Sequence, residues 1–553
     1  MRLTTNKLIL ATAIFLVLFD NVTFFQNVIG VYPFAEGKNL FFVVSLAFGL
    51  TGVLALFMSL LASRFTTKPL LIALLFMAAG SSYFANNYSV IIDYIMVQNI
   101  LQTNVREATD LFSLKLFLYI FFLGIVPALL VWLAPLEPQS WRQAAVSRLK
   151  LITIALLLIL IPLFLFSRFY ASFFREHEEL RFYSNPTYAL FSVYKYAKRN
   201  FATSAVTVEP IGTDANNLAT DRERELIILV VGEAARADRF SLNGYERPTN
   251  PLLSQEEVIF YPQVSSCDTS TATAVPCMFS DLTRAGFSNK KAAARENILD
   301  VVQRAGVNVL WRDNNSDSKG VALRVPYEDY QDPARNTICD VECRDEGMLV
   351  GLQEYIDAQK SGDILIVLHQ MGNHGPAYYK RYPKEFARFT PTCQTNQLDE
   401  CSPEEIGNAY DNAILYTDYF LSKTIALLKQ NDKQFETAMI YMSDHGESLG
   451  EFGVYLHGLP YLLAPETQKH IAAIMWFGAG FAVDRQILRQ QAGRELSQDN
   501  LFHTLLGSME IHTELYNPKL DILCDAHQCP PLQAGPYAKD KGEKQGVVRS
   551  GRK

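Results

Sequence analysis

The segment Cys267–Cys277, CDTSTATAVPC, places a run of hydroxyl-bearing residues between two cysteines. A disulfide would close this short loop and hold its threonines rigidly. We expect Thr271 to act as a nucleophile held against a metal ion, because a metal lowers the pKa of a hydroxyl and aligns the alkoxide with a phosphorus atom. If a helix begins after Ser270, its N-terminal amides also favour a phosphate, although Pro276 limits the length of that helix.

Carboxylates and imidazoles elsewhere in the chain follow short apolar runs. Glu233 comes after one such run, and Asp444 and His445 follow another. Two carboxylates and one imidazole suit a tetrahedral zinc ion, whose fourth position Thr271 would take. Four more residues could neutralise phosphate oxygens, act as acid or base, or bind a second metal; taken singly, each is more readily a capping or surface residue. They are Asn315, Lys319, His374 and His457.

The elements that must position these residues are buried strands alternating with helices. Helical stretches such as Asn408–Gln430 lie between the apolar runs. This pattern predicts an α/β domain over residues 223–530, with a mostly parallel sheet covered by helices on both faces. Ligands bind outside the carboxyl ends of such strands, where the candidate residues stand. The predicted strands are Leu226–Val231, Val307–Trp311, Ile364–Leu368, Ala438–Met442 and Ile471–Trp476.

The first 169 residues are rich in large apolar side chains and predict a membrane domain of five spans. Lys and Arg are enriched before the first span and in alternate loops, so we expect a cytoplasmic N-terminus and everything after Phe169 outside. No small-residue cleavage site follows the first run, so we expect no cleaved signal peptide. The predicted spans are Leu8–Phe25, Leu40–Ala62, Leu70–Ala85, Leu116–Ala134 and Leu151–Ser167.

The outer loop 86–115 is too long for a simple connector. Asn99, Thr103 and Glu107 follow one another at i, i+4 spacing and would share one face of a helix. This spacing indicates either a polar stripe at the outer membrane surface or an ordinary solvated helix face. Residues 170–222 predict an amphipathic connector along the membrane surface, and residues 531–553 predict a disordered tail.

Net charge and the positions of the cysteines indicate the cellular compartment and exclude one class of partner. The net charge of −7 over 553 residues argues against nucleic acid as a partner. All eight cysteines follow the predicted membrane domain, in close pairs that suggest disulfides in an oxidising space such as the bacterial periplasm. Structural zinc is the alternative, but the spacings lack paired His repeats. The pairs are Cys267/Cys277, Cys339/Cys343, Cys393/Cys401 and Cys524/Cys529.

Five motifs in order resemble the phosphoethanolamine transferases that modify lipid A, a family that includes the mobile colistin-resistance enzymes. The resemblance covers almost the whole chain, and it implies five spans ahead of a periplasmic domain like alkaline phosphatase. Two departures are Asp268, where many relatives carry glycine, and GEAAR in place of GETAR. The motifs are GEAARADRFSLNGY (232–245), CDTSTATAVPCMFS (267–280), DNNSDSKG (313–320), HQMGNHGPAYYKRYP (369–383) and SDHGESLGE (443–451).

The resemblance implies roles residue by residue. Zinc is expected at Glu233, Thr271, Asp444 and His445, with Thr271 carrying the covalent phosphoethanolamine. It also implies a lipid-contacting set at Asn99, Thr103 and Glu107, and contacts to substrate or further zinc at the second set: Asn315, Lys319, His374 and His457.

The implied reaction transfers phosphoethanolamine from phosphatidylethanolamine to a lipid A phosphate, in a monomeric, multi-pass protein of the bacterial inner membrane. Less negative lipid A would bind cationic peptides such as polymyxin and colistin less well. The alternative acceptor is a sugar of the lipopolysaccharide core. A sulfatase is disfavoured, because Cys277 is followed by Met-Phe-Ser instead of x-Pro-x-Arg, and a non-catalytic lipid or metal receptor has no need of Thr271.

Overall fold

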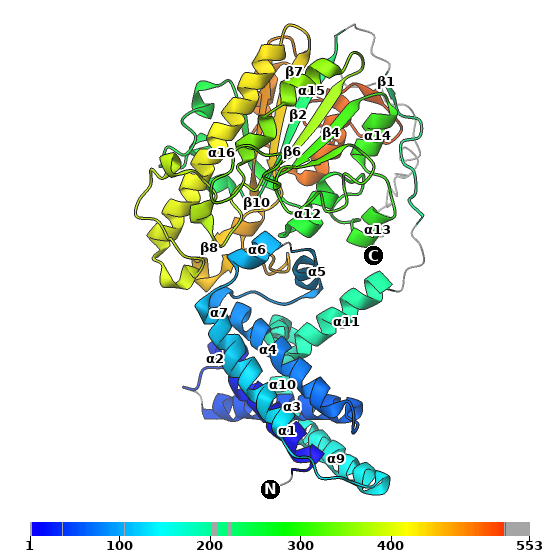
Figure 1. Ribbon diagram of the computed structural model, residues 1–553, viewed down its shortest axis with the longest axis vertical. Helices are drawn as coiled ribbons and strands as arrows, with labels where there is room; N and C mark the ends of the chain where they lie inside the picture. The colour runs from blue at the N-terminus through cyan, green and yellow to red at the C-terminus, as the bar shows by residue number, and fades with distance from the viewer. Residues whose placement is uncertain are drawn as a thin grey trace, which may run out of the picture.

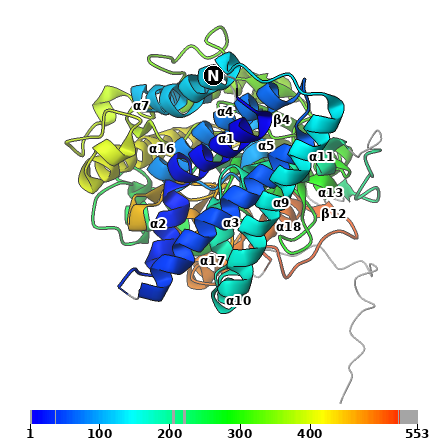
Figure 2. The ribbon, with the colours of Figure 1, turned by 90° about the horizontal axis from the view of Figure 1, so that it is seen from below.

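The computed structural model describes residues 3–35, 37–103, 105–201, 207–217, 223–524 and 526. Figure 1 shows apolar helices at one end, an α/β domain at the other, and α5 (Tyr94–Gln102) and α6 (Val105–Asp110) between them. Seen from below in Figure 2, α1 (Thr5–Phe19), α3 (Gly37–Leu61) and α9 (Trp141–Leu165) run side by side, with α3 packed against both neighbours.

Four helical segments of the described chain are long and apolar enough to cross a membrane. They are α3, α4 (Thr67–Tyr88), the continuous stretch Leu114–Leu133 and α9. That stretch comprises α7 (Leu114–Tyr119), the π-helix η1 (Ile120–Ile125) and α8 (Val126–Leu133). A fifth span exists only if α1 and α2 (Val22–Val31), which meet at a bend of 58°, are counted together. The predicted first span, Leu8–Phe25, is therefore interrupted after Phe19, and five spans are not confirmed.

The break in the first span has a local cause. Asn21 donates from Nδ2 to the Leu16 carbonyl (2.9 Å) and to the Asn185 carbonyl (2.7 Å), and its Oδ1 accepts from the Asn185 amide (2.8 Å). Asn185 Nδ2 donates in turn to the carbonyls of Asp20 (3.0 Å) and Ala78 (2.8 Å). This buried network satisfies the backbone groups that the break exposes, as an apolar environment requires.

One eight-stranded sheet forms the centre of the α/β domain, in the order β11-β3-β10-β7-β2-β6-β4-β5. Strands β7, β2, β6, β4 and β5 are parallel to one another. The run Ile471–Trp476, predicted as parallel, lies in β10 and is antiparallel to both neighbours. Apolar periodicity reports burial and not direction, which explains the error. Bounds are β2 Glu225–Gly232, β3 Ile259–Ser265, β4 Asn308–Asp313, β5 Tyr327–Asp329, β6 Ile364–His369, β7 Glu436–Ser443, β10 His470–Phe477 and β11 Leu496–Ser497.

Helices cover both faces of the sheet. Side chains of β2 alternate: Ile227 and Leu229 join a core with α14 (Ile298–Arg304) and α18 (Leu501–Ser508), while Leu226 and Ile228 face the other layer. That second layer is built by α15 (Leu352–Ala358) and by α16 (Pro403–Asn431), which includes the predicted Asn408–Gln430. The mostly parallel sheet with helices on both faces is thus confirmed.

The other elements connect or extend these layers. They are α10 (Ser167–Glu176), α11 (Thr187–Phe201), α12 (Thr271–Met278), α13 (Asn289–Ala293), α17 (Arg485–Gln491) and the paired short strands β1 (Asn216–Asn217) with β12 (Ile511–His512) and β8 (Ser448–Leu449) with β9 (Tyr455–Leu456).

Disulfides join three of the predicted pairs. These are Cys267–Cys277, Cys339–Cys343 and Cys393–Cys401. Cys524 is also disulfide-bonded, whereas Cys529, its predicted partner, lies outside the described residues.

Candidate active site

Neighbouring parallel strands bring the predicted ligands together at one edge of the sheet. β2 ends at Gly232, just before Glu233, and its neighbour β7 ends at Ser443, just before Asp444 and His445. His445 Nε2 lies 3.3 Å from Glu233 Oε1 and 3.3 Å from Asp444 Oδ2. The three side chains are fully buried. The carboxyl ends of parallel strands therefore place three donor atoms within contact of one another.

Thr271 stands at the first position of α12, with Ser270 as the N-cap residue. Its Oγ1 lies 3.2 Å from Glu233 Oε2 and 3.2 Å from His445 Nε2. The helix continues through Pro276 for only a short distance and ends at Met278. Thr271 is thus joined to the donor cluster, and the amides of the first turn of α12 face a position suited to an anion.

The donor set fits a metal ion. Asp444 Oδ2 is buried and has no hydrogen-bond partner among the described residues, although Oδ1 accepts from the amides of Ala234 (3.1 Å) and His445 (2.7 Å). His445 Nδ1 lies 2.8 Å from the Gly446 carbonyl, so Nδ1 carries the proton and Nε2 presents a lone pair to the cluster. Burial lowers the pKa of His445, which favours the neutral ring that a metal requires. Glu233, Asp444 and His445 can hold one ion together.

The backbone around Glu233 is held in an uncommon conformation. Ala234 has a φ of +54°, in the left-handed region, and its carbonyl accepts from the Tyr410 hydroxyl at 2.6 Å. Gly372 has a φ of +50°, and a Cβ at this position would meet the Glu233 backbone at about 3.0 Å. Strain of this kind persists only where surrounding contacts enforce it, and here it fixes the direction of the Glu233 side chain.

A second group of possible ligands lies beside the first. The ring centroids of His445 and His457 are 4.2 Å apart, and those of His374 and His457 are 5.6 Å apart. Glu233 with His374 and His457 forms one further group that could hold an ion, and His445 with Glu447 and His457 forms another. Burial, followed by neighbouring cationic groups, lowers the pKa of His374 well below its ordinary value. A neutral imidazole at His374 is able to ligate a metal.

A cavity of about 150 Å³ joins Thr271 to the loop of residues 86–115, which we call the membrane-side loop. Asn99 and Thr103, at α5, line it together with Lys319, His374 and His457 of the α/β domain. Lys319 Nζ donates to the Ser316 carbonyl at 2.8 Å, which holds the ammonium group beside Ser316, another lining residue. Asn315 lies deeper, where Nδ2 donates to Glu233 Oε2 (2.8 Å) and to the Gln370 carbonyl (2.7 Å).

The membrane-side loop is not one helix. Helix α5 ends at Gln102, and Thr103 is extended, with its hydroxyl donating to the Asn99 carbonyl at 2.8 Å. The expected continuous face through Asn99, Thr103 and Glu107 is therefore wrong, because this cap ends the helix. The backbone of Glu107 falls in α6, but its side chain lies outside what the structure describes.

Two buried acids near the site were not singled out from the sequence. Glu447 accepts from the Tyr378 hydroxyl (2.6 Å) and pairs with His457 Nδ1 (2.7 Å). It lies three residues after Asp444 in one motif, which was the available signal. Asp345 accepts from the amides of Met371 (2.8 Å) and Gly372 (3.1 Å) and thereby fixes the loop that precedes His374. No spacing pattern marks Asp345.

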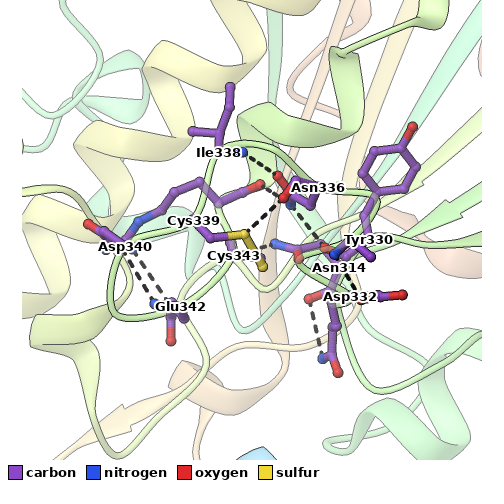
Figure 3. Close-up of a disulfide and its surroundings, with 12 residues drawn as sticks. Asn314, Tyr330, Asp332, Asn336, Ile338, Cys339, Asp340, Glu342 and Cys343 are labelled. Atoms are coloured by element: carbon purple, nitrogen blue, oxygen red, sulfur yellow. Dashed lines mark hydrogen bonds and ion pairs between the residues drawn. A yellow bond between two sulfur atoms is a disulfide. The ribbon is translucent and has the colours of Figure 1, made fainter.

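Figure 3 shows how the Cys339–Cys343 disulfide supports this region. Asn314, one residue after β4, donates from Nδ2 to the Cys343 carbonyl (3.0 Å) and to Asp345 Oδ1 (2.8 Å). Asn336 Nδ2 donates to the Tyr330 carbonyl at 2.9 Å on the other side of the same loop. The disulfide loop thus anchors Asp345 and, through it, the segment that carries His374.

Comparisons with known proteins agree with this architecture. A family profile described as Sulfatase matches residues 225–511, and one described as Phosphoethanolamine transferase EptA/EptB matches residues 50–201. The phosphatidylethanolamine transferase Mcr-2 of Escherichia coli is 45% identical over 489 residues, covering 86% of this chain and 90% of its own length. The chain belongs to the phosphoethanolamine transferase family.

Other family members match over similar lengths. The phosphoethanolamine transferase EptA of Escherichia coli is 38% identical over 525 residues, covering 93% of this chain and 96% of its own length. Among solved structures, the integral membrane protein lipooligosaccharide phosphoethanolamine transferase A from Neisseria meningitidis superposes with a TM-score of 0.91 at 34% identity, covering 95% of this chain and 100% of that one. The chain is therefore a phosphoethanolamine transferase with the two-part fold of its family.

Proposed function

We propose that this enzyme transfers phosphoethanolamine from phosphatidylethanolamine to a phosphate of lipid A through a covalent intermediate on Thr271. The observation that carries the proposal is the position of the Thr271 hydroxyl. It lies 3.2 Å from a carboxylate and 3.2 Å from an imidazole of the metal-fitting cluster, at the end of a cavity that reaches the membrane-side loop.

Zinc is the metal we propose for Glu233, Asp444 and His445, since mixed carboxylate and imidazole donors with one open position suit a catalytic zinc site. When bound, the ion would lower the pKa of the Thr271 hydroxyl and offset the charge of a phosphate. Asp444 Oδ2, which is buried and accepts no hydrogen bond from the described residues, supports this assignment.

In the donor step, Thr271 Oγ1 attacks phosphorus and the bond between phosphorus and the glycerol oxygen breaks. Diacylglycerol leaves with the proton that the hydroxyl loses, and phosphoethanolamine stays on Thr271. Lys319 is placed to neutralise phosphate oxygens, and His374 and His457 to relay the proton, because all three line the same cavity. Asn99 and Thr103 on the lower wall are positioned to contact the lipid headgroup.

In the acceptor step, an oxygen of a lipid A phosphate attacks the same phosphorus. The bond to Thr271 breaks and its oxygen takes back a proton, which restores the enzyme. The product carries an added ammonium group. An outer membrane that contains this modified lipid A should bind polymyxin and colistin less well.

The cellular arrangement belongs to the proposal too. The apolar N-terminal helices would lie in the bacterial inner membrane with the N-terminus cytoplasmic, and the catalytic domain would be periplasmic. Three disulfides in the described chain support an oxidising compartment. We propose that one monomer suffices, because a single chain supplies both the ligands and the cavity.

The experiment that tests the proposal is a mass spectrum of lipid A from cells that express the chain. We expect lipid A with added phosphoethanolamine, and unmodified lipid A from cells that express Thr271→Ala. Modification confined to core sugars would refute lipid A as the acceptor. Transfer retained by purified Thr271→Ala protein would refute the nucleophile.

A further inference from the structure

A second cavity, of about 350 Å³, lies against the Cys267–Cys277 loop and shares no lining residue with the cavity at Thr271. We call it the Asp268 cavity. Its walls come from α5, α11, the start of α12 and the segment around α13, and Figure 1 shows α5 and α11 on the membrane side of α12 and α13. Its volume lies in the range of pockets that bind small ligands.

Hydrogen bonds link residues that line the two cavities. Asn289 Nδ2 donates to Gln98 Oε1 (2.9 Å) and to Thr273 Oγ1 (3.2 Å), and Gln98 Nε2 reaches the Ala272 carbonyl at 3.5 Å. Thr273 is two residues from Thr271, less than one helical turn of about 5.4 Å along α12. The Asp268 cavity therefore lies close to the nucleophile, and the neighbouring α5 residues Gln98 and Asn99 line one cavity each.

Charged side chains of both signs line this cavity. Arg284 is held rigidly, with Nε donating to the Cys267 carbonyl (2.9 Å) and its guanidinium 3.4 Å from the Tyr461 ring centroid. Lys290 is exposed, and within the described chain it has neither a hydrogen bond nor an ion pair. Asp268 uses Oδ1 to accept from the Thr269 amide at 2.8 Å. Two cations against one carboxylate favour an anionic ligand that also carries hydrogen-bond donors.

Two further features point to a polar ring as the ligand. Asn289 Oδ1 is buried and accepts no hydrogen bond from the described residues, which is costly unless a ligand supplies a donor. Tyr196 also lines the cavity and offers an aromatic face on which a sugar ring can pack, whereas the Tyr94 ring has Lys195 Nζ 3.9 Å from its centroid. Burial raises the pKa of Asp268 to about 7, so hydroxyl or amide donors from a ligand would stabilise its charged form.

We propose that the Asp268 cavity binds the phosphorylated sugar of the acceptor while Thr271 carries phosphoethanolamine. Lys290 and Arg284 contact a sugar phosphate other than the one that attacks. Asp268 and Asn289 Oδ1 accept from ring hydroxyl or amide groups. This assignment rests on the proposed transfer function, and it gives a role to Asp268, a residue that the catalytic cluster does not use.

Binding of glucosamine 1-phosphate to the full chain in detergent micelles, followed by calorimetry, tests the cavity directly. We expect Lys290→Gln and Asp268→Asn each to weaken binding about five- to tenfold. Lys291→Gln is the matched control, because Lys291 is the next residue of α13, does not line the cavity and donates to the Gly286 carbonyl at 2.6 Å. Equal affinity in the wild type and both cavity variants would overturn the proposal, as would an equal loss in Lys291→Gln.

A second readout separates this proposal from the function on which it rests. Diacylglycerol release from phosphatidylethanolamine reports the donor step, and it should stay near the wild-type rate in Lys290→Gln and Asp268→Asn, which also shows that both variants fold. Transfer to an acceptor should show a raised KM. A wild type that releases no diacylglycerol would refute the transfer function, whereas release with an unchanged acceptor KM in both variants would refute the cavity assignment alone.

Two acceptor arms identify the source of the sugar. A glucosamine disaccharide phosphorylated at both ends represents lipid A, and a phosphorylated heptose represents the lipopolysaccharide core. The arm whose KM rises in Lys290→Gln, and not in Lys291→Gln, names the acceptor that occupies the cavity.

Discussion

At the scale of single residues, Asn315 shows how neutral groups hold the charged ones. Its amide bonds to both Glu233 Oε2 and the Gln370 carbonyl, so it fixes the carboxylate against the neighbouring loop. Partners of this kind around a metal ligand are worth about 10- to 100-fold in metal affinity. We expect Asn315→Ala to weaken zinc binding by this factor, measured by chelator competition on the purified protein.

Asn308 offers a matched control at the opposite end of β4, the strand that precedes Asn315. Asn308 begins β4 and donates to the carbonyls of Ser361 (2.8 Å) and Asp363 (3.1 Å), so Asn308→Ala loses a similar pair of bonds away from the ligands. Zinc affinity in Asn308→Ala should match the wild type. An equal loss in both variants would mean that Asn315 acts through general stability and not through Glu233.

Asp268 gives a prediction about pH. Its folded-state pKa of about 7 lies above the ordinary value of 3.8, so folding disfavours the carboxylate. Below pH 3.8 the carboxyl is protonated in both the folded and the unfolded chain, and the unfolding free energy is at its full value. As pH rises from 3.8 through 7 the unfolded chain loses this proton first, so the unfolding free energy falls. We expect the unfolding free energy of Asp268→Asn to rise relative to that of the wild type across this pH window. The rise should be on the order of 1 kcal/mol, because water in the cavity screens the charge. Thermal unfolding of the full chain at pH 4, 6 and 8 measures the difference; a constant difference would contradict it.

The sequence allowed the central residues to be predicted because their chemistry coincides with strand ends. Glu233, Asp444 and His445 each follow an apolar run, and parallel neighbours bring such positions together. Asp345 could not be predicted, because its role depends on amides contributed by a loop some 25 residues away. Glu447 shares a motif with Asp444, but only the folded chain shows that it supports His457.

At the scale of elements, apolar pattern predicted which segments are buried but not how they are directed or interrupted. The first apolar run contains Asp20 and Asn21, yet its average composition still resembles one span. Strand β3 was missed because Pro262 and half-exposed side chains interrupt its pattern. Both errors arise where a partner from elsewhere satisfies the backbone: Asn185 for the helix break, and β10 for β3.

The helix break yields a prediction about stability. Asn185 makes four hydrogen bonds through its side chain, amide and carbonyl, and it joins α1, α2 and α4 near one point. Asn185→Ala removes the side-chain bonds to the Asp20 and Ala78 carbonyls from this buried network. We expect a loss of about 2 kcal/mol or more in unfolding free energy, measured in micelles.

Asn6→Ala serves as its control. Asn6 Nδ2, at the start of α1, donates one bond, to the Ser147 carbonyl at 2.6 Å. Its loss should be clearly smaller than that of Asn185→Ala. Similar losses would show that the network at the break carries no special stability.

At the scale of the whole molecule, the membrane-side loop and the catalytic domain meet through polar contacts far apart in the chain. Asp110 of α6 pairs with Lys380 Nζ (2.6 Å) and Arg381 Nη2 (2.5 Å). Gln397 Nε2 donates to the hydroxyls of Tyr83 (2.9 Å) and Tyr88 (3.2 Å). These contacts join residues 83–110 to the catalytic domain. Nothing in the local pattern of either segment indicates them, since each pair spans about 270 to 315 residues.

Breaking this contact should slow transfer without removing the chemistry. Burial raises the pKa of Asp110, but Arg381 and Lys380 outweigh that effect and hold it below the ordinary value, so the carboxylate stays charged at neutral pH. We expect Asp110→Asn to lower the rate of diacylglycerol release from lipid vesicles about three- to tenfold and to speed hydrogen exchange in α5 and α6. Lys380→Met should do the same more weakly, and the double variant should be no worse than Asp110→Asn, because the two residues share one interaction.

Lys384→Met, which changes a nearby charge outside these contacts, is the control. Additive losses in the double variant, or unchanged exchange in α5, would show that the ion pair does not hold the loop against the catalytic domain.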